Sequence, residues 1–135
     1  TLNKISCEIE TVVDWEDESQ DILLRVRAYL DANCSHCHME NAHCSYREIR
    51  LDCANNDRDE NIGLCADFVE NVPELPGDIE HVLEPGDPEL SMMIYRMNLQ
   101  EENVQMPLIG KSLVHEEGVE LLIQYVEGLP EFPCP

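Results

Sequence analysis

The segment LDANCSHCHMENAHCS, residues 30–45, decides how the fold and chemistry of this chain are interpreted. Within it, Cys34, His36, Cys37 and His38 fall in five positions, and residues 34 to 38 have the form C-x-x-C-H. Such a cluster can be a metal site, a thiol redox couple, part of a disulfide framework or the attachment site of a cofactor. The surrounding sequence has to distinguish these four possibilities.

The spacing of the cluster favours attachment of a haem. Two thiols three positions apart at the end of a helix can both form thioethers with the vinyl groups of one porphyrin, and His38 is then placed as an axial ligand of the iron. A zinc site needs a second ligand pair, which Cys44 and Cys53 supply only loosely. A thioredoxin-like couple needs a preceding strand and a βαβ pattern, whereas a helical pattern precedes this motif.

A candidate for the sixth iron ligand lies in VQMPLIG, residues 104–110. Met106 is followed by Pro107 in a segment that breaks a helical pattern, and a thioether there is a soft, neutral ligand that raises the reduction potential relative to a second histidine. Met106 is therefore predicted to be the distal ligand. Three histidines are fallback ligands: His43, His81 and His115.

Three amphipathic helices are predicted, because apolar residues recur at helical spacing in three segments. Residues 16–33 begin with acidic side chains that suit a helix N-terminus. The helix over 87–97 has an N-cap aspartate followed by proline, and the one over 115–129 ends at glycine and proline. The middle helix carries three methionines that we expect to fill the core: Met92, Met93 and Met97.

The predicted class is all-α with long irregular loops, in one domain over 1–135 whose residues 1–15 form an irregular N-terminal segment. One short strand is compatible with the alternation in 47–51. Four prolines and two glycines between 73 and 88 argue against long elements there.

Three stretches carry a resemblance to a known family: RAYLDANCSHCH (27–38), EPGDPELSMMIYRM (84–97) and MPLIGKSLVHEEGVELLIQYVEGLP (106–130). In this order they resemble blocks of small monohaem c-type cytochrome domains of bacteria, found at the ends of larger secreted or periplasmic redox proteins. The stretches cover 51 of the 135 residues, and residues 39–80 have no firm match.

The resemblance implies an all-α, cytochrome c-like fold with long irregular loops around one covalently bound haem c. By position, it makes Cys34 and Cys37 the thioether residues, His38 the proximal iron ligand and Met106 the distal one. A porphyrin in the core would also account for the low aromatic content, which is 5%.

Seven cysteines are present, so five remain after haem attachment: Cys7, Cys44, Cys53, Cys65 and Cys134. Haem attachment takes place outside the cytoplasm, and oxidation of these thiols is therefore expected. One scheme joins Cys7 to Cys134 and closes a loop among the other three. The resemblance suggests another scheme, which joins Cys65 to Cys134.

The sequence also suggests a residue that contacts a haem propionate. Arg96 is the first candidate, because its guanidinium matches a carboxylate, with Arg47, Arg50 and the hydroxyl of Tyr46 as alternatives.

A bound calcium ion is a weaker hypothesis, because its candidate ligands lack the order of an EF-hand: Asp52, Asp57, Asp59 and Asn61.

The predicted function is electron transfer by the haem iron cycling between Fe(II) and Fe(III), in a periplasmic or secreted protein. With both axial positions filled, the chain is expected to be a carrier and not an enzyme. Its net charge of −21 disfavours nucleic acid and anionic membranes and favours redox partner proteins with a basic docking surface. No apolar run approaches the length of a membrane span, so membrane insertion is not expected. The chain could then be a module of a larger redox protein. The alternatives are a peroxidase-like haem enzyme, if the distal site is open, and a zinc-stabilised interaction module.

Overall fold

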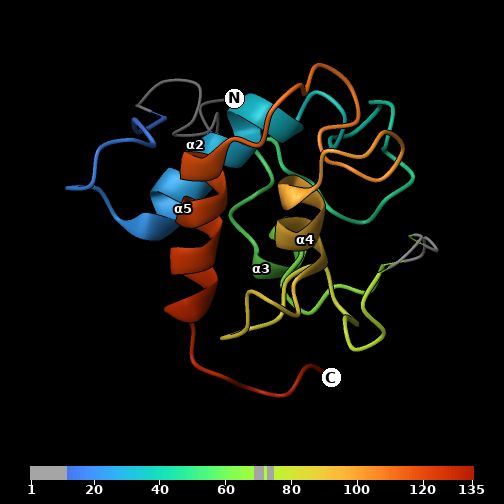
Figure 1. The fold of residues 1–135 in the computed structure, drawn as a ribbon. Helices are drawn as coiled ribbons and strands as arrows, with labels where there is room; N and C mark the ends of the chain where they lie inside the picture. The colour runs from blue at the N-terminus through green and yellow to red at the C-terminus, as the bar shows by residue number, and fades with distance from the viewer. Residues whose placement is uncertain (1–11, 69–71, 73–74) are drawn as a thin grey trace. The chain divides into compact units, whose positions relative to one another are not determined.

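The computed structural model describes residues 12–68, 72 and 75–135 (Figure 1). Helices make up about 30% of the described residues, and most of the others are irregular. The described part contains no strand, and its β-type pairing is limited to isolated bridges. The described helices are α2 (Ile22–Cys34), α3 (Asp59–Ile62), α4 (Met92–Asn98) and α5 (Glu116–Glu127).

The prediction of an all-α, cytochrome c-like fold is therefore wrong. Two of the described helices have seven residues or fewer, too short for helical packing to dominate the structure. Much of the chain is instead held by backbone hydrogen bonds between irregular segments. Examples join Arg50 N to Asn61 O at 2.8 Å and Val82 N to Ala66 O at 2.8 Å. Glycine, proline and short polar residues favour such turns over regular elements.

The chain divides into two compact units, residues 1–62 and 63–135. The first contains α2 and α3, and the second contains α4 and α5. The expectation of a single domain over 1–135 stays a prediction.

In the first unit, α2 begins at Ile22 and not near residue 16 as predicted. Asp14 and Asp17 explain the difference, because their carboxylates accept hydrogen bonds from the backbone N–H groups of Glu16 and Ser19, both at 3.0 Å, and hold turns. Asp21 is the N-cap, and its carboxylate accepts from Leu23 N at 3.0 Å.

One face of α2 is buried as the periodicity predicts, with Val26, Tyr29 and Leu30 in the interior. The Trp15 ring meets Tyr29 edge-on, with 5.2 Å between the ring centroids. Buried Asn56 ties a loop to the helix by accepting from Arg27 Nε at 2.9 Å and donating to the Arg27 carbonyl at 3.0 Å. The segment 47–51 is not a strand, so that expectation is wrong.

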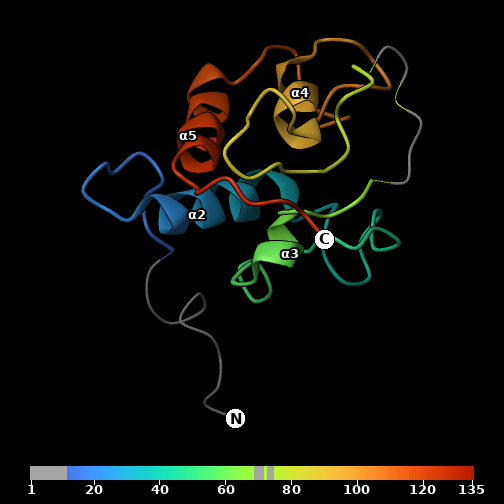
Figure 2. The ribbon, with the colours of Figure 1, turned by 90° about the horizontal axis from the view of Figure 1, so that it is seen from below.

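In the second unit, α4 and α5 contact each other, as both ribbon views show (Figures 1 and 2). Met92 and Met97 of α4 are buried, which confirms their predicted core role, and Met93 is half-buried. A hydrophobic cluster gathers around α4 and consists of Val72, Ile79, Met92 and Val104, with Phe68, Leu75, Leu90, Tyr95 and Leu99 packed against it.

The sequence places the start of the α4 helix four residues too early. Asp87 does cap a turn, since its carboxylate accepts from Glu89 N at 3.0 Å and Leu90 N at 3.2 Å. The fully buried Ser91 then adopts an extended backbone, and its hydroxyl donates to the Asp87 carbonyl and accepts from Glu84 N, both at 2.9 Å. These tertiary contacts of Ser91 delay the helix until Met92.

The last helix is confirmed as α5, with His115 at its N-cap position and Gly128 at its C-cap position. After α5 an irregular segment, drawn in red in Figure 2, leads to Cys134, which forms a disulfide with Cys65. The pairing suggested by the resemblance is therefore confirmed, and the scheme joining Cys7 to Cys134 is wrong. Cys7 itself lies outside the described residues. No described helix has the length and apolar character needed to span a membrane.

Candidate functional site

The C-x-x-C-H motif lies where α2 ends. The backbone N–H groups of Cys37 and His38 donate to the carbonyl of Cys34 at 3.2 and 3.0 Å, so the chain continues in a tight turn after the helix. The N–H of Leu51 donates to the His38 carbonyl at 2.8 Å and fixes the far end of this turn. The structure thus gathers the three predicted residues of the first unit, Cys34, Cys37 and His38, on one turn of backbone.

The two cysteines of the motif are thiols in a protein that also forms disulfides. Cys34 and Cys37 are not disulfide-bonded, whereas Cys53, Cys65 and Cys134 are. Burial raises the pKa of the Cys34 thiol to about 12, with a smaller contribution from the neighbouring Cys37. A neutral thiol is the opposite of an activated nucleophile, which argues against a thioredoxin-like couple at this site.

The zinc alternative loses part of its ligand set. Cys53 is disulfide-bonded and supplies no thiolate. Cys44 is a buried thiol whose backbone N–H donates to the Cys37 carbonyl at 2.9 Å. Among the residues that the structure describes, the motif's sulfur and imidazole groups do not converge with a third ligand as a metal site requires.

Met106 lies in the second unit, in the loop between α4 and α5, and is half-buried. Its N–H donates to the Arg96 carbonyl at 3.0 Å, and the Arg96 guanidinium donates through Nε to the Val104 carbonyl at 2.7 Å. The backbone around Met106 is therefore tied to α4. The propionate role of Arg96 stays a prediction, and the hydrogen bond from its Nε goes to the protein backbone.

Lys111 is a residue of this loop that the sequence analysis missed. Its ammonium group donates to the carbonyls of Met97 at 2.5 Å, Leu99 at 2.7 Å and Met106 at 3.1 Å. Burial lowers the pKa of Lys111 below its usual value of 10.5. Lys111 thereby links the Met106 loop to the C-terminal end of α4, and no local sequence signal marks this role.

The same loop exposes apolar side chains. Leu108, Ile109 and Leu113 are 44%, 85% and 75% exposed, although each is large and hydrophobic. A shallow cavity of about 480 Å³ lies beside Leu108 and Ile109 and has a mostly polar lining: Gln100, Glu102, Asn103, Gln105, Leu108, Ile109, Lys111 and Ser112. Exposed apolar side chains next to one another mark a candidate contact surface more often than isolated ones do.

The alternative propionate contacts of the first unit are engaged locally. Arg50 donates to the backbone carbonyls of Ser45 and Ile49, both at 2.9 Å, and also to that of Arg47. The Arg47 guanidinium lies 4.7 Å from the centroid of the exposed Tyr46 ring. Arg50 therefore stabilises its own loop, while Tyr46 lies on the surface.

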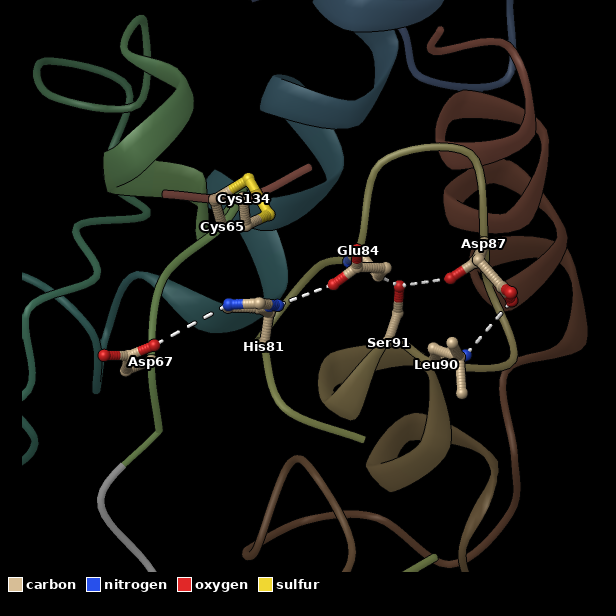
Figure 3. Close-up of polar contacts among 8 residues, drawn as sticks. All are labelled: Cys65, Asp67, His81, Glu84, Asp87, Leu90, Ser91 and Cys134. Carbon is tan, nitrogen blue, oxygen red and sulfur yellow. Dashed lines mark hydrogen bonds and ion pairs between the residues drawn. A yellow bond between two sulfur atoms is a disulfide. The ribbon is translucent and has the colours of Figure 1, made fainter. Parts of the chain in front are cut away.

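The fallback histidines differ in their surroundings. His43 is exposed, and His115 lies at the start of α5 with its Nε2 3.6 Å from a carboxylate oxygen of Glu117. His81 is half-buried, and its two ring nitrogens lie 2.6 Å from Glu84 and 3.7 Å from Asp67 (Figure 3).

The structure of the loop that suggested a calcium site does not support one. Asp52 accepts from Asn55 Nδ2 at 2.7 Å, and Asn61 donates to the Asn55 carbonyl at 2.7 Å, so these side chains stabilise turns. Asp57 and Asp59 are exposed. In the described part of the chain, the loop carboxylates do not meet closely enough to hold a common ion.

Comparisons with known proteins identify no relative. No protein-family model matches the chain, no curated protein matches it, and no solved structure matches its fold. The functional argument therefore depends on the chemistry of the residues themselves.

Proposed function

We propose that the chain is an electron carrier that binds one haem c covalently through Cys34 and Cys37, with His38 and Met106 as the axial ligands of the iron. One observation carries the proposal: Cys34, Cys37 and His38 share one turn, and both cysteines are thiols, whereas three other described cysteines form disulfides. Thioether formation requires two such thiols beside an axial histidine.

The residues fit the group chemically. Cys34 and Cys37 are both thiols, the form from which thioethers are made. Met106 is a soft neutral donor in a loop fixed by Arg96 and Lys111. When bound, the haem supplies an iron that accepts and releases one electron, and the two ligands tune its potential. With both axial positions filled, the iron has no open coordination position for a substrate.

The contact surface of the carrier follows from the same loop. Leu108, Ile109 and Leu113 are exposed apolar side chains in the loop that contains Met106, in a chain of net charge −21. We propose partners with a basic docking surface, since charge governs the on-rate of such brief encounters. The disulfide in the second unit favours an oxidising compartment, so we propose a periplasmic or secreted location.

The proposal is tested in the full chain matured in a bacterial host that attaches haem in its periplasm. The wild-type protein is expected to be coloured, to keep its haem through acid–acetone extraction and to show low-spin iron. His38→Ala is expected to lose the low-spin spectrum, while the matched change His115→Ala keeps it. Colourless, folded protein from a competent host would contradict the proposal and favour a zinc-stabilised module. High-spin iron with peroxide turnover would favour the haem-enzyme alternative.

A further inference from the structure

A cluster of metal-binding side chains lies beside the disulfide of the second unit and takes no part in the proposed function. His81 Nδ1 lies 2.6 Å from a carboxylate oxygen of Glu84. The sulfur of Cys134 joins them, and the three ligand atoms all lie within 4.8 Å of one another (Figure 3). A histidine nitrogen, a carboxylate oxygen and a cysteine sulfur are the donor types that bind zinc.

The backbone holds this cluster in place. The N–H of Cys65 donates to the Leu83 carbonyl at 3.0 Å and that of Val82 to the Ala66 carbonyl at 2.8 Å, so the chain just after His81 runs beside the Cys65 segment. The N–H of Glu84 donates to the hydroxyl of Ser91 at 2.9 Å, and Ser91 is fully buried. The side chains of His81 and Glu84 are 13% and 24% exposed. A metal ion would therefore meet a partly buried and preformed pair of ligands.

In the oxidised chain the Cys134 sulfur is bonded to Cys65 and carries no negative charge. Zinc binds the thiolate form of cysteine, so the disulfide blocks the site. A dithiol can remove this block: its two thiols become a disulfide, and the Cys65–Cys134 bond takes up two electrons and two protons to give two thiols. Both sulfurs are released at the same place, because they were directly bonded.

We propose that reduction of the Cys65–Cys134 disulfide by a dithiol converts this cluster into a zinc site, with Cys65, Cys134, His81 and Glu84 as its ligands. Two sulfurs, one nitrogen and one oxygen complete a tetrahedral set, and zinc displaces the protons of both thiols on binding. The net charge of −21 favours uptake of a cation. The site does not involve haem, so it goes beyond the electron-carrier function and stands or falls separately.

The test uses the full chain with Cys34→Ser and Cys37→Ser, which removes the haem motif as a competing thiol site. The protein is reduced with a dithiol, freed of it without oxygen, and titrated with cobalt(II) as a coloured substitute for zinc. We expect one cobalt per chain, with the visible bands of tetrahedral geometry and a thiolate charge-transfer band, and displacement by zinc. The oxidised protein is expected to show none of these bands.

Matched variants locate the ligands. His81→Gln keeps the disulfide in the oxidised protein and is expected to weaken cobalt binding by at least about tenfold, since even an indirect partner of a metal ligand is worth about that much. Cys134→Ser is expected to remove the charge-transfer band. The matched controls His115→Gln and Cys53→Ser are expected to leave cobalt binding and the charge-transfer band unchanged.

Three results would overturn the proposal: absence of tetrahedral cobalt in the reduced chain, equal binding by the oxidised chain, or a spectrum that survives both His81→Gln and Cys134→Ser. Near-ultraviolet circular dichroism of the oxidised His81→Gln protein checks that this variant is folded.

Discussion

At the scale of the residue, burial keeps Cys34 a neutral thiol because it raises the thiol pKa from 9.0 to about 12. In haem-free protein, alkylation of Cys34 at pH 8 is therefore expected to be at least about tenfold slower than in the chain unfolded in guanidinium, since only the thiolate reacts. The stability contributed by the neutral thiol is present below pH 9.0 and is lost as the pH rises through about 12.

Alkylation rates measured by peptide mass mapping from pH 7 to high pH check this prediction. The Cys34 rate in the folded chain should keep rising well above pH 9. Equal rates for Cys34 in the folded and unfolded chains at pH 8 would contradict it.

Met106 provides the second prediction at this scale, and it depends on the proposed function. The oxidised protein should show a weak sulfur-to-iron charge-transfer band in the far red. Met106→His is expected to remove that band and to lower the potential by a sizeable part of the about 0.8 V that axial ligands span, because imidazole is the stronger donor to Fe(III). Redox titration and the oxidised spectrum measure both effects. Met93→Leu is the matched control, and loss of the band there but not in a Met106 variant would disprove the assignment.

Residue patterns predicted part of the site. The C-x-x-C-H spacing is local, so Cys34, Cys37 and His38 could be recognised without knowing the fold. The cluster around His81 could not, because Cys134 is remote in sequence and reaches it only through its disulfide to Cys65. Long-range placement of this kind leaves no periodic signal.

At the scale of the element, the loop between α4 and α5 is held by Lys111, whose ammonium donates to three backbone carbonyls. Lys111→Met removes these hydrogen bonds and is expected to lower the free energy of unfolding by about 1–2 kcal/mol, allowing for water that reaches the carbonyls. Guanidinium denaturation measures this change.

Arg58→Met is the control for loss of a positive charge, because the Arg58 side chain is 69% exposed and its ion pair with Glu60, at 3.9 Å, lies on the surface. It is expected to change the stability little. Lys111→Met with no greater effect than this control would show that the lysine does not hold the loop.

The ends of the helices agree with the sequence prediction only where no other side-chain contact competes for the same backbone groups. The buried face of α2 and the position of α5 were predicted from apolar spacing. The starts of α2 and α4 were not predicted correctly. Turns held by aspartate side chains precede α2, and hydrogen bonding by the buried Ser91 hydroxyl keeps Ser91 extended just before α4. Side-chain bonds to the backbone replaced the first helical turn in both cases.

At the scale of the whole molecule, the predicted fold class is wrong because it rests on three amphipathic segments, whereas most of the described residues are irregular. The irregular segments are stabilised by backbone hydrogen bonds between turns and by the Cys65–Cys134 disulfide, which joins residues far apart in the sequence. Apart from the number of cysteines, the amino-acid composition predicts neither of these contributions. The high proline and glycine content of residues 73–88 was the one clear indication.

The net charge of −21 leads to a prediction about partners. Electron transfer to a basic test cytochrome is expected to slow by about tenfold as salt shortens the Debye length from about 30 Å at 0.01 M to about 8 Å at 0.15 M. Transfer to an acidic test cytochrome should be slow at low salt and should not slow further. Stopped-flow reduction across a salt series measures both. A rate with the basic partner that is independent of salt would leave solubility as the role of the charge.

Covalent haem attachment at Cys34 and Cys37 is measured by the intact mass of the chain matured in a haem-attaching periplasm. We predict a wild-type mass that exceeds the polypeptide by one haem, and a Cys34→Ala, Cys37→Ala protein whose mass is that of the polypeptide alone. A folded wild-type chain with no added mass, or a haem adduct that persists in the double variant, would contradict it.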